Sequence, residues 1–271
     1  MNSTPSFAEI EIRGRDAGSF LHSQLASEVA GLAPGQWRFG SYCQVDGRVQ
    51  SLLMCARLEA ECFRLLLPED NCAEVVQRLL RFRIRAKCEI SSEPVSIAAG
   101  MNGARSYACA DFNWEIRTRE SDRPALPQSL WSAQITLGVP WLTTPVAGKF
   151  MPVMLALERL QAFSLRKGCY PGQEILARTH YLGRSKRRLV MLRVLDDGQP
   201  AAGLELFCKA DAPAVGAVIC AAASHVLAVV NETVTSADLL HAPTVTSKFV
   251  VDRNLEAEPA AGLLNGVARA T

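Results

Sequence analysis

The segment RKGCYPGQEILAR, residues 166–178, gathers the side chains best suited to chemistry in this sequence. A cysteine reacts and binds metals as its thiolate, and nearby cations favour that form. Lys167 lies two residues before Cys169, so its ammonium is placed to tune the thiol. Gly168 and Gly172 permit unusual backbone angles and a close approach of the backbone to a ligand. The pattern predicts a pocket with a reactive thiol, and a plain structural turn is the weaker alternative.

The polar residues that follow this cysteine suit a heterocyclic ligand. The amide of Gln173 and the carboxylate of Glu174 match the donors and acceptors of such a ring. Tyr170 is able to stack on a ring, because aromatic faces pack against one another.

The composition is that of an ordinary soluble globular protein. The 271 residues are 49% apolar and 21% charged. The net charge of +2 gives no overall field that would attract nucleic acid or membrane. No apolar run approaches the roughly 20 residues of a membrane span, and the first residues do not resemble a signal peptide. We therefore expect a cytoplasmic protein without a membrane partner.

The cysteine and histidine patterns argue against disulfides and against a metal site. The sequence has nine cysteines, none of them in a C-x-x-C pair. A disulfide framework is not expected in a chain of this length without a secretion signal. Outside the motif, reduced cysteines serve most often as small apolar side chains. The four histidines lack the spacing of zinc ligands.

A second stretch, RFRIRAKCEI at residues 81–90, alternates cations with apolar residues. On a strand this period of two gives one basic face and one apolar face. Two interpretations stay open. The strand could lie at a sheet edge, where cations discourage unwanted pairing, or it could bind an anion such as a phosphate or a polyglutamate chain.

The elements around these segments follow from hydrophobic periodicity. We expect a hairpin whose strands meet at Asp46-Gly47, a pair that suits a two-residue turn. The expected helices are residues 16–32, residues 68–82 with Asp70 or Asn71 as cap, and a helical stretch around residues 156–163. After Gly183 short strands alternate with turns, which predicts a small barrel.

The motif resembles the signature of the YgfZ family, folate-binding relatives of the glycine-cleavage aminomethyltransferase (T-protein). The matching residues are Phe150, Pro152, Leu157, Lys167, Gly168, Cys169, Tyr170, Gly172, Gln173, Glu174, Ala177, Arg178, Gly183, Lys186 and Arg187. The resemblance extends to residues 12–25, to the turn at 46–49 and to the segment 82–90. It departs from the family at residues 153–156, where Val-Met-Leu-Ala replaces a frequent Gln-x-x-Asn.

The resemblance implies an α+β fold of the T-protein type, with two α+β units around a folate-sized central cavity and a C-terminal β-barrel beside them. We assign residues 1–90 and 146–182 to the folate-binding unit that carries the motif. Residues 91–145 form a smaller second unit, and residues 183–250 form the barrel. Residues 251–271 lack a strand pattern and are expected to be a mobile tail.

The resemblance also implies a function. Members of the family are implicated in the assembly or repair of iron–sulfur clusters in client enzymes, including radical enzymes that methylthiolate tRNA. The implied ligand is tetrahydrofolate or a derivative, with transient contact to a cluster and a monomeric state. Cys169 is then the reactive thiol and Lys167 tunes it. The implied folate-binding residues are Tyr170, Gly172, Gln173, Glu174, Arg178 and the aromatic Trp131.

The main alternative is a true aminomethyltransferase that transfers a one-carbon unit to tetrahydrofolate. T-proteins carry an acidic pair just after the glycine turn, where an acid can assist departure of the amine. In this sequence Ser51-Leu52 occupy those positions, and neither residue can act as that carboxylate. Whether the protein is an enzyme stays open at this point.

A further alternative is direct binding of tRNA. Arg184 and residues 186–188 form a basic cluster after the motif, and residues 81–87 add four cations. Basic stripes are typical of nucleic-acid-binding proteins. No recognised RNA-binding motif is present, however, and the net charge is near zero, so we favour an indirect route through a client enzyme.

Overall fold

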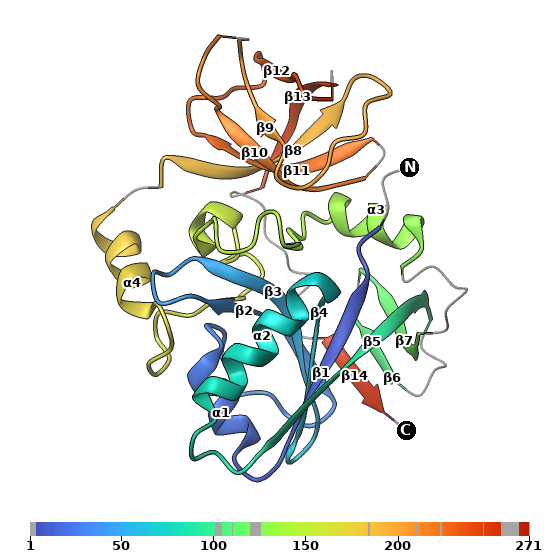
Figure 1. Ribbon diagram of the computed structural model, residues 1–271, viewed down its shortest axis with the longest axis vertical. Helices are drawn as coiled ribbons and strands as arrows, with labels where there is room; N and C mark the ends of the chain where they lie inside the picture. Colours follow the sequence, from blue (N-terminus) through green and yellow to red (C-terminus); the bar gives the residue numbers. More distant parts are fainter. Residues whose placement is uncertain are drawn as a thin grey trace.

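The computed structural model describes residues 4–100, 105–109, 111–119, 126–183, 185–209, 211–222, 224–245, 247–255 and 266–270. Two β-sheet bodies are stacked along the long axis, and helices and irregular chain lie beside and between them (Figure 1). Strands and helices are mixed along the chain, as expected of an α+β fold. Among the described residues, no helix is long and apolar enough to cross a bilayer.

The lower body in Figure 1 is a closed barrel of antiparallel strands. Its strands are β1 (Phe7–Arg13), β2 (Gln36–Cys43), β3 (Val49–Glu59), β4 (Cys62–Pro68), β5 (Glu89–Ala99), β6 (Arg105–Ala108), β7 (Asn113–Thr118) and β14 (Gly266–Ala270). They pair in the order β1-β4-β3-β2-β14-β6-β7-β5, and β5 returns to β1.

Two helices cover the outer face of this barrel, α1 (Ala17–Gln24) and α2 (Glu69–Phe82). Their apolar residues pack on the outward side chains of β1, β3 and β4 in one buried cluster. The predicted side-chain cap of α2 is wrong, because Pro68 takes the cap position. Asp70 and Asn71 bond the 142–144 segment instead, through the Thr144 amide and the Leu142 carbonyl.

Aromatic side chains fill part of the opposite, inner face. The rings of Trp114 and Trp141 stack with centroids 6.1 Å apart, and Phe7 meets both of them edge-on. Phe39 and Trp37 extend the cluster along β2. These rings are fully buried and belong to one hydrophobic core cluster.

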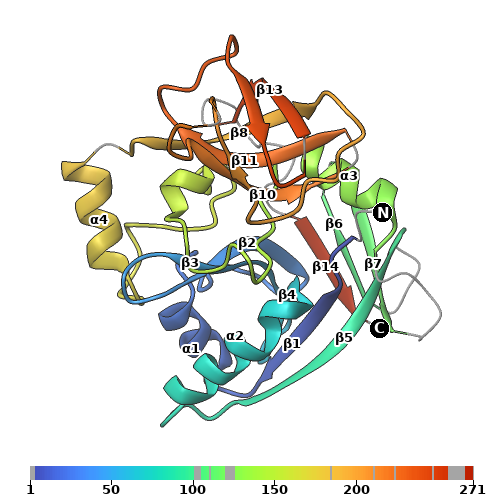
Figure 2. The same ribbon diagram turned by 45° about the horizontal axis from the view of Figure 1, so that its top comes forward.

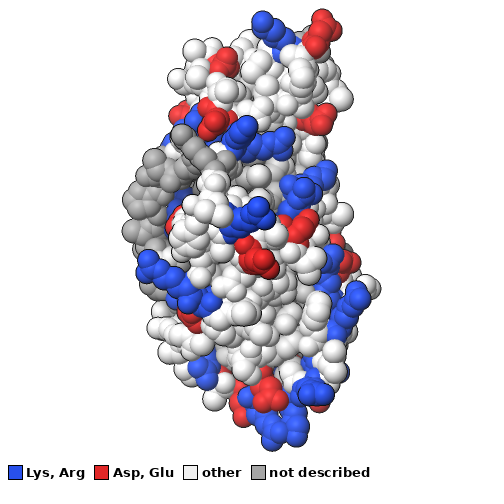
Figure 3. Space-filling view, turned by 90° about the vertical axis from the view of Figure 1, so that its left-hand side faces the viewer, with Lys and Arg blue, Asp and Glu red and all other residues white. Residues whose placement is uncertain are grey.

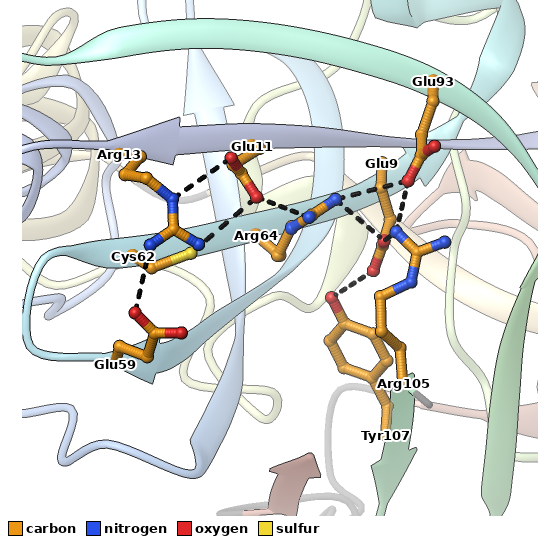
Figure 4. Close-up of polar contacts among 9 residues, drawn as sticks. All are labelled: Glu9, Glu11, Arg13, Glu59, Cys62, Arg64, Glu93, Arg105 and Tyr107. Carbon is orange, nitrogen blue, oxygen red and sulfur yellow. Dashed lines mark hydrogen bonds and ion pairs between the residues drawn. The ribbon is translucent and has the colours of Figure 1, made fainter. Parts of the chain in front are cut away.

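Further along β1 the inner face changes from aromatic to ionic (Figure 4). Glu9 is almost fully buried, and its carboxylate accepts hydrogen bonds from Arg105 and from the hydroxyl of Tyr107, at 2.6 and 2.8 Å. Arg64 lies between Glu9 and Glu11 and pairs with both. Because β1, β4 and β6 supply these side chains, the network joins strands from different parts of the barrel.

The upper body is a second sheet made after residue 186. Its strands are β8 (Arg187–Val194), β9 (Glu205–Leu206), β10 (Gly216–Ala221), β11 (His225–Asn231), β12 (Leu239–Ala242) and β13 (Ser247–Asn254). They pair in the order β12-β13-β8-β11-β10-β9. Phe207, just after β9, and His241 on β12 exchange two backbone hydrogen bonds, which curls the sheet towards the small barrel predicted after Gly183.

Short helices and turns lie between the two bodies. Helix α3 (Gln128–Thr136) and helix α4 (Gln173–Leu182) lie on opposite sides of the molecule in both views (Figure 2). The helix expected around residues 156–163 is absent from this described segment. A 3-10 turn, η1 (Pro152–Leu155), ends at Ala156, whose left-handed φ of 50° stops the helix.

The strand expected over residues 81–90 is also wrong. Helix α2 continues to Phe82, and Arg83 to Cys88 form a loop before β5 begins at Glu89. The turn closes through a bond from the Ala86 amide to the Arg83 carbonyl. The alternation of cations and apolar residues therefore arises from a helix end and a turn, and Phe82 and Ile84 face solvent.

The expected boundaries also change. The boundary at residue 90 falls within β5, which pairs with β1, so β5, β6 and β7 complete the same barrel as the N-terminal strands. The tail was expected to lack strands. This is wrong for β14, which lies between β2 and β6 and closes the barrel, and for the end of β13.

Candidate functional site

Lys167, the first charged residue of the motif core, is buried and holds the backbone of another segment. Its ammonium donates hydrogen bonds to the carbonyl oxygens of Leu25 and Ser27, at 2.6 and 2.9 Å, and to that of His22. Burial lowers the pKa of this ammonium to about 8. The side chain thus ties the motif to the C-terminal end of α1, where unpaired carbonyls favour a cation.

Tyr170 is the second buried residue of the motif. Its ring lies 5.2 Å from the Lys167 ammonium, close enough for a cation–π contact. Its hydroxyl is buried without a hydrogen-bond partner among the described residues. Buried polar groups in native proteins are nearly always satisfied, if not by protein then by water or a ligand. The hydroxyl is therefore a candidate contact for a bound molecule.

Gly172 fits the motif against the hairpin turn between β2 and β3. Its φ is 83°, and a Cβ atom there would lie 2.7 Å from the Cα of Gly47 and still closer to the Gln44 carbonyl. The hairpin itself is confirmed, but its turn spans residues 44–48 rather than two residues. Only glycine permits this backbone conformation together with this close approach.

The polar residues of the motif have separate roles. The Gln173 amide donates to the Lys167 carbonyl at 3.0 Å and so closes the turn on itself. Glu174 and Arg178 are exposed on α4. They lie on the same helix as Gln173, which is its first residue. The heterocycle contacts of these three side chains stay a prediction.

Cys169 is exposed between the two buried residues of the motif. All nine cysteines lie in described parts of the chain, and of these Cys169 is the exposed one, with the other eight buried or half-buried. Burial raises the pKa of the thiols of Cys43 and Cys55 to about 12, which makes them poor nucleophiles. No atom lies within 4 Å of a Cβ placed on the neighbouring Gly168. The thiol is therefore exposed to solvent on a turn whose flanking residues, Lys167 and Tyr170, are buried.

Trp131 lies on α3, away from the motif. It lines a cavity of about 820 Å³ between α3, the N-terminal segment and the upper sheet. Its indole N–H donates to the Ala221 carbonyl at 2.7 Å. The structure thus separates Trp131 from the other predicted ligand residues, since α4 contributes none of the described residues that line this cavity.

The polar residues of this cavity were not predicted from the sequence. The lining includes Ser6, Glu69, Asp70 and Thr143. They come from segments far apart in the chain, and no spacing in the sequence links them. Their contact with Trp131 follows only from the way α3 packs between the two sheets.

The positions expected to be acidic in a transferase lie on β3. Ser51 and Leu52 are both fully buried. Leu52 belongs to the apolar core, and the Ser51 hydroxyl bonds the Leu52 carbonyl. This strand position therefore provides no carboxylate. Among the described residues, no three His, Cys, Asp or Glu side chains come together as a metal site.

Comparison with known proteins identifies relatives along most of the chain. No protein-family model matches it. An uncharacterized protein of Haemophilus influenzae is 27% identical over 221 residues, which cover 78% of this chain and 79% of that protein. Two proteins named tRNA-modifying protein YgfZ follow. The one from Colwellia psychrerythraea is 28% identical (69% of each chain), and the one from Edwardsiella ictaluri is 27% identical (73% and 72%). The chain is therefore similar to YgfZ proteins over 69–73% of its length.

The fold of this chain is of the T-protein type. The structure of the glycine cleavage system aminomethyltransferase T from Bartonella henselae matches with a TM-score of 0.64, over 94% of this chain and 87% of that one. At 12% identity this match shows the fold alone. Both the family resemblance and the α+β, T-protein-like fold predicted from the sequence are therefore confirmed.

Proposed function

We propose that this protein is an accessory protein in the assembly or repair of iron–sulfur clusters in client enzymes, with Cys169 as its reactive thiol. Some of those clients modify tRNA, so the protein supports tRNA modification indirectly. The proposal draws on the relatives named tRNA-modifying protein YgfZ and on the motif. Thiolate is the ligand that iron–sulfur clusters prefer.

The observation that carries the proposal is the exposure of Cys169 on a fixed base. A thiol that meets a cluster inside another protein has to project from its own surface. Lys167 and Tyr170 are buried on either side of the exposed pair Gly168-Cys169. The buried residues fix the turn, so the thiol is presented at a constant place.

The proposal is tested in a strain that lacks its own homologue. Wild type, Cys169→Ala and the control Cys208→Ala would be expressed at equal levels. Cys208 is half-buried in the upper sheet and outside the motif. We expect wild type and the control to restore the activity of an iron–sulfur enzyme, and Cys169→Ala to fail. Equal rescue by Cys169→Ala would contradict the proposal.

We also propose that a tetrahydrofolate binds in the cavity beside Trp131. Cofactor sites commonly have volumes of about 300–1,000 Å³ and combine apolar walls with a few polar groups. This cavity has such a size, with Trp131 and prolines as walls. Glu69 Oε2 pairs with Arg119 and Asp70 Oδ2 accepts from the Thr144 amide, which leaves the other oxygen of each carboxylate as an acceptor. Carboxylates match the amino and ring N–H donors of a pterin. The residues present therefore fit the ring of the cofactor, which would supply one-carbon or redox chemistry when bound.

Calorimetric titration with folinic acid tests this site. Trp131→Ala should raise the dissociation constant by about tenfold or more, because an aromatic wall and a hydrogen-bonded indole are lost. Gln173→Ala is the matched control in the motif and should bind as wild type does. The opposite result, with binding lost in Gln173→Ala alone, would move the ligand to the motif.

The second candidate function is an aminomethyltransferase, and the fold match is the observation that favours it. The buried Ser51-Leu52 pair argues against it, because no carboxylate at that position can act as the acid. Release of ammonia from an aminomethylated carrier protein, dependent on added tetrahydrofolate, would establish the transferase and displace the accessory role.

Direct binding of tRNA is not favoured by the surface beside α4. Lys and Arg side chains are spread over this face and alternate with Asp and Glu, without one continuous basic area (Figure 3). A protein that binds nucleic acid through phosphates usually concentrates its cations. We therefore keep the indirect route, through a client enzyme.

A further inference from the structure

The loop between α2 and β5 exposes apolar side chains that the proposed function does not use. Leu80 and Phe82 at the end of α2 are 44% and 47% exposed, and Ile84 in the loop is 85% exposed. In both views this loop lies beside α1 at the lower left of the molecule (Figure 1). Clustered apolar side chains at a protein surface commonly mark a binding site.

The loop is held in place rather than frayed. The Asp16 carboxylate accepts a hydrogen bond from the Lys87 amide at 2.8 Å, and the Arg83 guanidinium donates to the Cys88 carbonyl at 3.0 Å. Cys88 is buried against the helices and anchors the end of the loop. Ile84 is therefore exposed on a backbone with fixed bonds at both sides, which suits a preformed contact surface.

Between the loop and α1 lies a groove of about 630 Å³. Its described lining consists of Asp16, Ser19, Phe20, Ser23, Phe82, Ile84, Arg85 and Ala86. Asp16 is engaged with the Lys87 amide, and the α1 side is otherwise neutral. The exposed cation Arg85 lines the groove, and three more exposed cations are chain neighbours of lining residues, namely Arg15, Arg81 and Lys87. The groove thus has an apolar wall and a basic rim.

We propose that this groove binds a peptide segment of a partner protein in which apolar residues alternate with Asp or Glu. The apolar side chains enter between Phe20, Phe82 and Ile84, and the carboxylates meet the rim. Charge complementarity of this kind sets the choice of partner and speeds association. The inference goes beyond the proposed function, because it involves neither Cys169 nor the cavity at Trp131.

The shape of the site favours a peptide over a membrane surface. A lipid bilayer contacts protruding side chains, and firm membrane attachment takes a larger apolar area than the few side chains here provide. An open groove between a helix and a loop instead offers an extended segment a surface to lie along, as in other grooves that bind peptides.

The test is a selection from a displayed library of random dodecapeptides on the full-length protein, with counter-selection on Ile84→Asp/Arg85→Glu. We expect the retained peptides to alternate Leu, Ile or Phe with Asp or Glu. In anisotropy titrations each single substitution should weaken the best peptide by about tenfold or more. Ile84 and Arg85 are exposed, so both variants should keep the melting temperature of the wild type.

Two matched controls carry the same chemical changes on the upper sheet. Leu195→Asp and Lys209→Glu alter an exposed apolar residue and an exposed cation there, and both should bind the peptide as wild type does. The proposal is overturned if no peptide distinguishes wild type from the double variant, or if the selected peptides lack acidic residues. A different ligand would overturn it as well. This is the result if no peptide is selected, and if phosphatidylglycerol vesicles or a single-stranded RNA oligonucleotide bind the wild type but not Ile84→Asp.

Discussion

Within the motif, neighbouring residues divide between fixing the backbone and facing solvent. Lys167 and Tyr170 are buried, and Gly168 and Cys169 between them are exposed. The sequence suggested that Lys167 tunes the thiol. Its ammonium is instead surrounded by three backbone carbonyls at the end of α1. Lys167 therefore fixes the backbone of the turn, and this turn presents Cys169 to solvent.

Lys167→Met tests this structural role. Methionine fills similar space but donates no hydrogen bond, so the carbonyls of His22, Leu25 and Ser27 lose their donor. Leaving buried acceptors unpaired costs about 1–3 kcal/mol. We expect the free energy of unfolding in urea to fall by about that amount at pH 7. An unchanged free energy of unfolding in Lys167→Met would contradict the role of Lys167 in holding this backbone.

The same residue predicts a dependence of stability on pH. Burial lowers the pKa of Lys167 to about 8 in the folded chain, below its ordinary value of 10.5. Between these two values the unfolded chain binds more protons, so this group makes the wild type more stable as pH rises. Lys167→Met lacks the effect. The stability difference between wild type and variant should therefore widen between pH 8 and pH 10.5 in urea titrations.

At the scale of elements, the contact between α4 and the β2–β3 turn sets where the motif lies. Gly172→Ala would push a Cβ against the Gly47 backbone and force an alanine to a φ of 83°. We expect a loss of about 2 kcal/mol or more in unfolding free energy. Gly168→Ala is the matched control three residues before Pro171, and a Cβ there would meet no atom within 4 Å beyond its chain neighbours. Its effect should stay within about 0.5 kcal/mol, measured by thermal denaturation.

Local patterns predicted the elements whose hydrophobic period runs without interruption. The β2–β3 hairpin and α2 have such patterns, and both are present near the expected bounds. The strand predicted for residues 81–90 was wrong because the alternating pattern there spans the end of a helix and a turn. The helix around residues 156–163 failed because left-handed backbone at Ala156 and Gln161 interrupts it. That conformation was not visible in the residue types.

Two features depend on tertiary packing and have no local sequence pattern, the closing strand β14 and the cavity at Trp131. β14 completes the barrel by pairing with β2, more than 220 residues earlier in the chain. The cavity at Trp131 brings together Ser6, Asp70 and Thr143, whose spacing in the sequence carries no signal. The motif was found because its residues are contiguous. The separation of Trp131 from it depends on the packing of α3.

At the scale of the whole molecule, the ionic network inside the barrel connects strands that are not neighbours in the sheet. Glu9 on β1 binds Arg105 and Tyr107 on β6, across the interior (Figure 4). Glu9→Gln removes the charge that two guanidinium groups share. Breaking a buried ion pair on one side costs about 3–5 kcal/mol.

Chemical denaturation checks this prediction. The matched control is Glu59→Gln, which removes an exposed partner of Arg13. An exposed ion pair contributes less than about 1 kcal/mol, so that variant should unfold almost as wild type does. Equal effects of Glu9→Gln and Glu59→Gln would mean that the buried network does not hold the barrel together.

The central claim is that Cys169 is the residue through which the protein supports client enzymes. The most direct measurement is the content of methylthiolated adenosine in tRNA from a strain without its own homologue, complemented with wild type, Cys169→Ala or Cys208→Ala. We predict normal content with wild type and with Cys208→Ala, and content near that of the uncomplemented strain with Cys169→Ala. Normal content with Cys169→Ala, at equal protein level, would contradict the account and leave the motif as a scaffold.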